Sequence, residues 1–187
     1  MSASTDFNNL RATLSALTGH GVVPGVSAAL QNGRDGFVRE LISAVSTEVP
    51  AYIESGNPEL IPELEAHIGE IVDAACQLLS GERVGPLAFV AEHAQRRAAQ
   101  NFPLDAHLHA DRCAHRNLTR WVRDAALEAP AESAQVRRVV AAVTDFTVEF
   151  TGALGTVLTS EYVAHTRALA EAEGDRRTRL LLSLIHI

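Results

Sequence analysis

The chain has 187 residues, a formal net charge of -7 and a pI of about 5.6. An acidic chain has no overall positive field to attract phosphate backbones or anionic lipids, so we expect no direct binding to nucleic acid or membranes. Apolar residues make up 47% and charged residues 21%, as in folded globular proteins rather than disordered chains. No apolar run approaches the roughly 20 residues that span a bilayer, so we expect a cytoplasmic protein.

The first 33 residues differ from the rest in their weak periodicity and their turn-forming residues. A short amphipathic pattern runs through Phe7, Leu10, Leu14 and Leu17. It is followed by Gly19, Gly21, Pro24 and Gly25. We therefore predict a flexible arm over residues 1–33 that carries one short amphipathic helix, followed by a helical domain over residues 34–181.

From Asp35 onward, apolar residues recur with the 3.6-residue period of a helix, interrupted by proline and glycine. The pattern predicts helices over residues 35–52, 57–81, 86–101 and 103–129, and a long final helix from residue 132 in which Gly152 and Gly155 are candidate kinks. No segment shows strand alternation with hairpin turns. The predicted fold is all-α, either a five- to six-helix bundle or a globin-like arrangement, between which the pattern does not decide.

The junction between the third and fourth predicted helices carries the most distinctive motif. Residues 92–116 read EHAQRRAAQNFPLDAHLHADRCAHR, and Trp121 follows. This resembles the N-terminal helical region of PucR-type transcriptional regulators of actinobacteria, which is similar to the N-terminal domain of RsbR-type stressosome proteins. The family pattern is RRAEQG, PLE, LLHAYR and GHR before a tryptophan. The resemblance extends over residues 34–181, because Tyr162 and the segment to Leu181 resemble the family's connector.

The resemblance implies a sensory or regulatory helical domain of a transcription factor, whose DNA-binding helix-turn-helix lies outside this chain. Our leading interpretation is a signal-input and dimerisation domain. A stressosome-like partner-binding domain, or a small metal- or haem-binding helical sensor, is the alternative. The sequence departs from the family pattern at His107 (leucine expected), Asp111 (tyrosine expected) and Asn101 (glycine expected). Asparagine tolerates the left-handed conformation of a helix cap, so this last departure is mild.

No motif for enzymatic activity is present. The chain lacks GxSxG, GxGxxG and GxxxxGK[ST], and its two cysteines, Cys76 and Cys113, lack metal-binding spacing. We expect no catalytic function, no cofactor and no dedicated metal site.

One side of the fourth predicted helix is basic. On a helical projection, a stripe is formed by His109, Arg112, Cys113, Arg116, Arg120 and Arg123. Such a stripe is either an interaction surface for an anion or an acidic partner, or a solvated face paired with nearby carboxylates.

The opposite side of this helix is apolar but is interrupted at one-turn intervals by His107, Asp111 and His115. A buried polar group without a partner costs about 1 to 3 kcal/mol, so we expect these side chains to bond to one another, to another helix or to a ligand. A ligand-binding pocket and a hydrogen-bonded core cluster are the two interpretations. His93, one turn from Phe89, is the position where a haem ligand would be sought in a globin-like fold, although a structural role is more common for such a histidine.

Two expectations concern the final predicted helix and the residues after it. The helix carries more apolar surface than one neighbour needs, at Val139, Val143, Phe146, Phe150 and Leu154, so we expect a homodimer. We also expect residues 182–187, LSLIHI, to be non-native: isoleucine is otherwise absent after Ile71, and the hexapeptide matches a translated sequencing-library adapter.

Overall fold

The computed structural model describes residues 3–18, 23–80, 82, 87–128 and 133–185. These residues form seven helices and contain no strand, which confirms the predicted all-α class. The helices are α1 (Ala3–Thr18), α2 (Val23–Glu48), α3 (Ala51–Glu54), α4 (Leu60–Leu79), α5 (Ala88–Ala99), α6 (Leu104–Glu128) and α7 (Ser133–Ile185). The predicted helix boundaries at residues 81, 86 and 129–132 lie outside the described residues.

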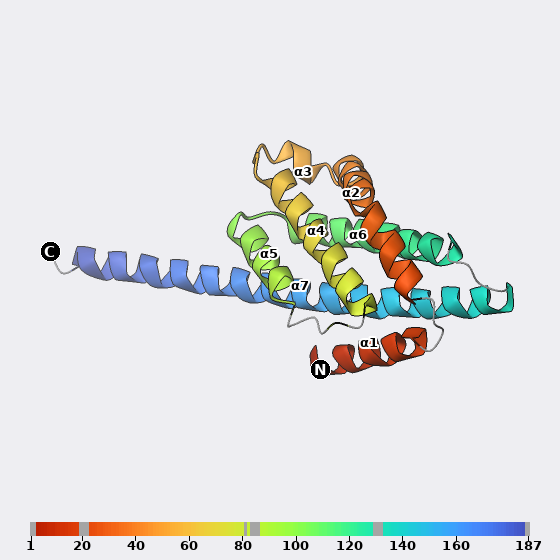
Figure 1. Cartoon of the computed structure of the whole chain (residues 1–187). Coiled ribbons are helices and arrows are strands. Elements are labelled where there is room, and N and C mark those ends of the chain that lie inside the picture. The colour runs from red at the N-terminus through yellow and green to blue at the C-terminus, as the bar shows by residue number, and fades with distance from the viewer. Residues whose placement is uncertain (1–2, 19–22, 81, 83–86, 129–132, 186–187) are drawn as a thin grey trace.

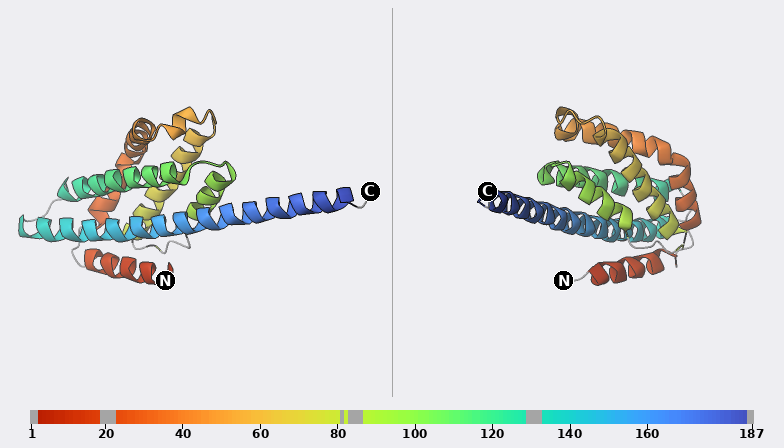
Figure 2. Two further views of the ribbon diagram at one scale, coloured as in Figure 1. Left: turned by 180° about the vertical axis from the view of Figure 1, so that it is seen from behind. Right: turned by 90° about the vertical axis from the view of Figure 1, so that its left-hand side faces the viewer.

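The helices are arranged in layers around α7 (Figure 1). Helix α1 packs on one side of α7, and α5 and α6 pack on the other side. Helices α2 and α4 form the outer layer, in which α2 contacts α6 and α4, and α4 contacts α5. The outer layer runs across the direction of α6 and α7 (Figure 2), so the fold is a bundle with crossed layers.

The N-terminal region differs from the predicted arm. The proposed boundary at residue 33 falls inside α2, which begins at Val23. Pro24 lies in the first turn of this helix, where a missing backbone N–H breaks no helical hydrogen bond, so the proline starts the helix. Leu17 of α1 and Val26 of α2 are fully buried. Of the residues that suggested a loose arm, Pro24 and Gly25 thus lie within α2, whereas Gly19 and Gly21 lie outside the described residues.

The turn between α5 and α6 shows why asparagine is tolerated at position 101. Asn101 has a φ of 53°, in the left-handed region that normally favours glycine. Its N–H donates to the carbonyl of Ala98, and the N–H of Phe102 donates to the carbonyl of Arg97, each over 3.0 Å. This pair of hydrogen bonds is the Schellman motif, which ends α5 and turns the chain toward Pro103 and α6.

Helix α7 is continuous over 53 residues, including the candidate kinks at Gly152 and Gly155. Its first half is central to the core, because the described side chains on one face are buried against neighbouring helices. Its second half projects beyond the other helices (Figure 1), and side chains 166–177 are exposed. Residues 186 and 187 of the proposed non-native tail lie outside the described residues. None of the described helices combines the length and apolarity needed to span a bilayer.

Candidate functional site

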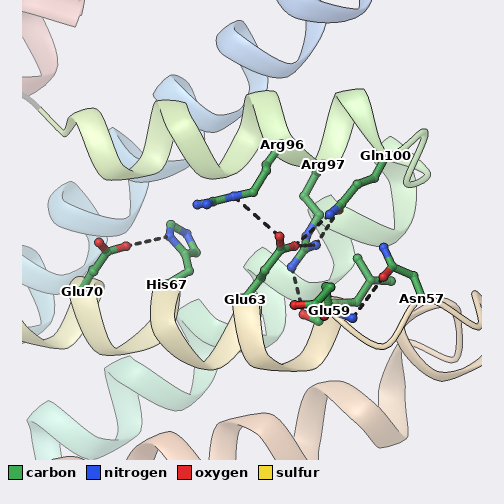
Figure 3. A network of polar contacts seen from close by, with 9 residues as sticks. Asn57, Glu59, Glu63, His67, Glu70, Arg96, Arg97 and Gln100 are labelled. Atoms are coloured by element: carbon green, nitrogen blue, oxygen red, sulfur yellow. Dashed lines mark hydrogen bonds and ion pairs between the residues drawn. The ribbon is translucent and has the colours of Figure 1, made fainter.

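Two groups of polar side chains occupy the interior where α4, α5 and α6 meet. One is the arginine network, formed by Arg97, Glu63 and Gln100. The other is the histidine cluster, formed by His67, His93 and His107. Figure 3 shows the network and one of the histidines, between the ribbons of α4 and α5.

The arginine network is built around Arg97, whose side chain is 0% exposed. Nη1 of Arg97 donates to Oε2 of Glu63 over 2.6 Å and to Oε1 of Gln100 over 2.7 Å. Nη2 donates to the backbone carbonyl of Leu60 over 2.9 Å. The amide of Gln100 donates to the same Glu63 oxygen over 3.0 Å, which closes the network. The guanidinium carbon also lies 5.7 Å from the ring centroid of Tyr52.

This network connects the end of α5 to the beginning of α4. Arg97 and Gln100 are at the end of α5, whereas Leu60 is the first residue of α4 and Glu63 is in its first turn. A guanidinium offers five N–H donors in a rigid plane and serves several acceptors at once, as it does here. Arg97 and Gln100, the second arginine and the glutamine of the motif, therefore have a structural explanation: they join the end of α5 to the beginning of α4.

The histidine cluster takes one imidazole from each of three helices, His67 from α4, His93 from α5 and His107 from α6. The rings of His67 and His93 are stacked, with centroids 3.8 Å apart and an interplanar angle of 3°. The His107 ring lies 5.4 Å from His93, tilted by 45°, and 6.2 Å from Tyr162 of α7. All three histidines are buried.

Burial holds these imidazoles in the neutral form. Desolvation, assisted by nearby His107 and Arg97, lowers the pKa of His67 to about 3. Desolvation also lowers the pKa of His107 to about 4, again with a contribution from Arg97, and it moves the pKa of His93 far below its ordinary value. Within the described part of the chain, four buried ring nitrogens have no hydrogen-bond partner: Nδ1 of His67, both nitrogens of His93 and Nε2 of His107.

The predicted triad of His107, Asp111 and His115 is only partly brought together. His107 joins the histidine cluster, whereas Nδ1 of His115 forms a 2.8 Å hydrogen bond with the hydroxyl of Thr151 on α7. In the described part of the chain no hydrogen bond joins Asp111 to either histidine, so the three side chains do not bond to one another, and His115 instead bonds to another helix, as one of the expected alternatives has it. Burial raises the pKa of Asp111 to about 6, opposed by Arg112, and burial lowers the pKa of His115.

Asp111 lines two small cavities that share a wall. The first, of about 30 Å³, is also lined by all three residues of the histidine cluster. The second, of about 20 Å³, is also lined by His115 and Thr151. A cavity of this size holds one or two water molecules, whereas ligand pockets for organic molecules are typically about 300 Å³ or larger. In the portion of the chain that the structure describes, no three His, Cys, Asp or Glu side chains are placed to hold a metal ion.

The basic stripe on α6 is partly paired. Arg116 forms an ion pair with Glu48 of α2, and Arg123 forms one with its neighbour Asp124. Arg112 and Arg120 are exposed. Cys113, which the helical projection placed in the stripe, is fully buried, since it faces the α2 side of the helix. The paired arginines agree with a solvated face that bonds to nearby carboxylates, and such exposed pairs contribute little stability.

The sequence reasoning missed Glu63 and His67, although a signal was present. Both lie between the apolar residues of α4, and each is one turn from the other on the face that carries Leu60, Leu64 and Ile68. Polar residues that interrupt an apolar helix face must find partners inside the fold. The same argument singled out His107 on the fourth predicted helix and applies equally here.

The crossed helical layers (Figure 2) define an all-helical domain. A family model specifies it further: residues 35–179 match the RsbT co-antagonist protein rsbRD N-terminal domain. The chain therefore belongs to that family, which comprises regulatory input domains, and the predicted RsbR-type resemblance is confirmed. Comparisons with curated proteins and with solved structures found no match.

Proposed function

We propose that the chain is the signal-input and dimerisation domain of a bacterial transcriptional regulator of the PucR type. Family membership supports the input role, and the motif across residues 92–116 supports the PucR-type context. In this proposal a helix-turn-helix elsewhere in the regulator binds DNA, and this acidic domain controls it without touching DNA.

The observation that carries the dimerisation proposal is the exposed face of α7. The apolar residues first expected to form the interface, Val139, Val143, Phe146, Phe150 and Leu154, are buried inside the protomer by its own helices, so that reasoning was wrong. A different face remains open. Val148 is 48% exposed, Val163 is 40% exposed, and Gly152 between them has no atom near the position of a Cβ.

This exposed row of α7 suits a second copy of the chain. Ala141, Val148, Gly152, Val163 and Ala170 lie on one side of the helix, and all are exposed. Small residues allow two helix backbones to approach closely, and a symmetric dimer places the same face of both copies together. The row continues into the projecting half of α7 (Figure 1). A helix that packs against no other helix is only marginally stable, so contact with a second copy stabilises this half.

Sedimentation velocity over micromolar concentrations tests this proposal. We expect the wild-type chain to sediment as a dimer and Val148→Glu to sediment as a monomer. Ile53→Glu is the matched control, because Ile53 is 59% exposed but lies on α3, and it should remain dimeric. A monomeric wild type at all concentrations would refute dimerisation through this face.

A stressosome-like partner-binding domain is the second candidate. The family description, an N-terminal domain of an RsbT co-antagonist protein, favours it. A chain that acts in this way should co-sediment in large assemblies with proteins of its source cell, rather than control a promoter. No arrangement in the described residues favours the metal- or haem-binding alternative, since no three potential ligands are placed to hold a metal ion and the cavity beside His93, of about 30 Å³, is far too small for a haem.

A further inference from the structure

The histidine cluster has no structural explanation of the usual kind. Buried polar atoms are nearly always hydrogen-bonded, yet four ring nitrogens of His67, His93 and His107 have no hydrogen-bond partner among the residues that the structure describes. Two of these rings are stacked at 3.8 Å, so no counter-ion fits between them. The adjoining cavity of about 30 Å³ has room for water but not for an organic ligand. The partners available to these nitrogens are therefore water in this cavity or a proton.

The surroundings of the cluster disfavour a positive charge. Arg97, fully buried, lies on the same helix as His93 and acts electrostatically on all three histidines. Glu63 already binds Arg97, and the Glu70 carboxylate is exposed, 4.0 Å from Nδ1 of His67. The titratable and charged groups around the cluster are Tyr52 on α3, Glu63 and Glu70 on α4, Arg96 and Arg97 on α5, Asp111 on α6 and Tyr162 on α7.

We propose that the histidine cluster is an acid-sensitive latch, in which proton uptake in mildly acidic solution separates the stacked rings and opens the junction of α4, α5 and α6. An imidazolium in the closed junction would face Arg97 and a second imidazole, whereas in the open junction water solvates it. Acidification as the signal read by this domain rests on the proposed input function, but the opening itself does not.

The direction of the effect follows from proton linkage. The closed form holds the pKa of His67 at about 3 and that of His107 at about 4, below the ordinary 6.5. The open form therefore binds more protons between pH 6.5 and pH 4, and opening becomes easier as the pH falls through that window. Asp111 acts in the opposite sense, because its pKa of about 6 lies above the ordinary 3.8 and the closed form keeps that proton. The two histidines outweigh the single carboxyl.

One net proton bound by the open form sets the expected size. An ordinary histidine pKa is about 6.5, and pH 5 lies one and a half units below it. If the open form binds one proton more than the closed form, the equilibrium constant for opening rises roughly 30-fold between pH 7.5 and pH 5. Hydrogen–deuterium exchange of the full chain, corrected for intrinsic rates, measures this change locally. The peptide covering residues 88–99 of α5 reports the junction, and a peptide from residues 3–18 of α1, which packs on the far side of α7, serves as the reference.

His107→Leu is the decisive variant, since leucine fills the site without a titratable ring. We expect wild-type α5 to lose about 30-fold or more of its protection between pH 7.5 and pH 5, and His107→Leu to lose at least tenfold less. His165→Gln on the projecting part of α7 is the control and should behave as wild type. Equal losses in wild type and His107→Leu, or unchanged α5 protection at pH 5, would overturn the latch.

A second measurement keeps the result interpretable if His107→Leu folds poorly. Imidazole resonances of the wild-type cluster should stay neutral down to the opening pH and then change together with α5 exchange. Independent titration of the three rings near pH 6.5 in a closed junction would also contradict the proposal. Sedimentation at pH 7.5 in the same preparation tests dimerisation separately, so failure of the latch and failure of the proposed function are distinguishable.

Discussion

Glu63→Ala removes the only carboxylate that bonds to the buried Arg97 in the described part of the chain. The guanidinium then keeps two acceptors, the Gln100 amide oxygen and the Leu60 carbonyl, but no counter-charge. Breaking a buried ion pair from one side costs about 3 to 5 kcal/mol. Since two acceptors remain and the Glu63 side chain is 20% exposed, we expect the lower end, about 3 kcal/mol of unfolding free energy.

Urea unfolding followed by Trp121 fluorescence measures this loss, which corresponds to roughly 6 to 12 °C in Tm for a domain of this size. Glu65→Ala, exposed on the same helix, is the control and should change stability by less than about 0.5 kcal/mol. Adding Arg97→Met to Glu63→Ala should cost less than the sum of the single changes, because the uncompensated charge is removed. A Glu63→Ala variant as stable as Glu65→Ala would refute the argument that the network holds α4 to α5.

Three further predictions concern single side chains. Asp111→Asn should raise stability by about 1 kcal/mol at pH 7.5, after discounting for partial exposure, because the raised carboxyl pKa of about 6 makes the ionised form costly above that pH. The gain should shrink as the pH falls from 6 toward 3.8, and pH-dependent urea titrations check it. Tyr162→Phe removes the buried hydrogen bond from its hydroxyl to the Phe102 carbonyl and should cost about 1 to 2 kcal/mol by the same assay. Gly33→Leu should displace the Trp121 indole, 3.3 Å from the position of a Cβ, with a loss of about 1 to 3 kcal/mol and a shifted fluorescence maximum.

The sequence predicted the helices well where one signal dominated. Asn101 directly follows the cap residue of α5 in the left-handed conformation, as expected from the tolerance of asparagine for it. Prediction failed at the end of the proposed arm, which was placed at residue 33. Gly33 lies within α2, where it provides room for Trp121, and only the packing of α6 on α2 shows this.

The site was less predictable because its residues come from separate helices. The apolar pattern along α6 correctly predicted that His107 is a buried polar residue. Its neighbours in space, His67 and His93, depend on how α4, α5 and α6 cross, which a helical period does not encode. The periodicity placed His107, Asp111 and His115 together on one helix, yet their side chains turn to three different surroundings, the histidine cluster, the cavities and Thr151.

The continuity of α7 has a mechanical consequence. Between Val163 and Arg177 the helix extends roughly 21 Å past the residues that anchor it, at about 1.5 Å per residue. A rigid rod of that length converts a tilt of about 5° at the anchored part into a displacement of roughly 2 Å at Arg177. Because α5 and α6 both pack on the anchored part, a rearrangement of either helix is amplified along this lever without any change in the lever itself.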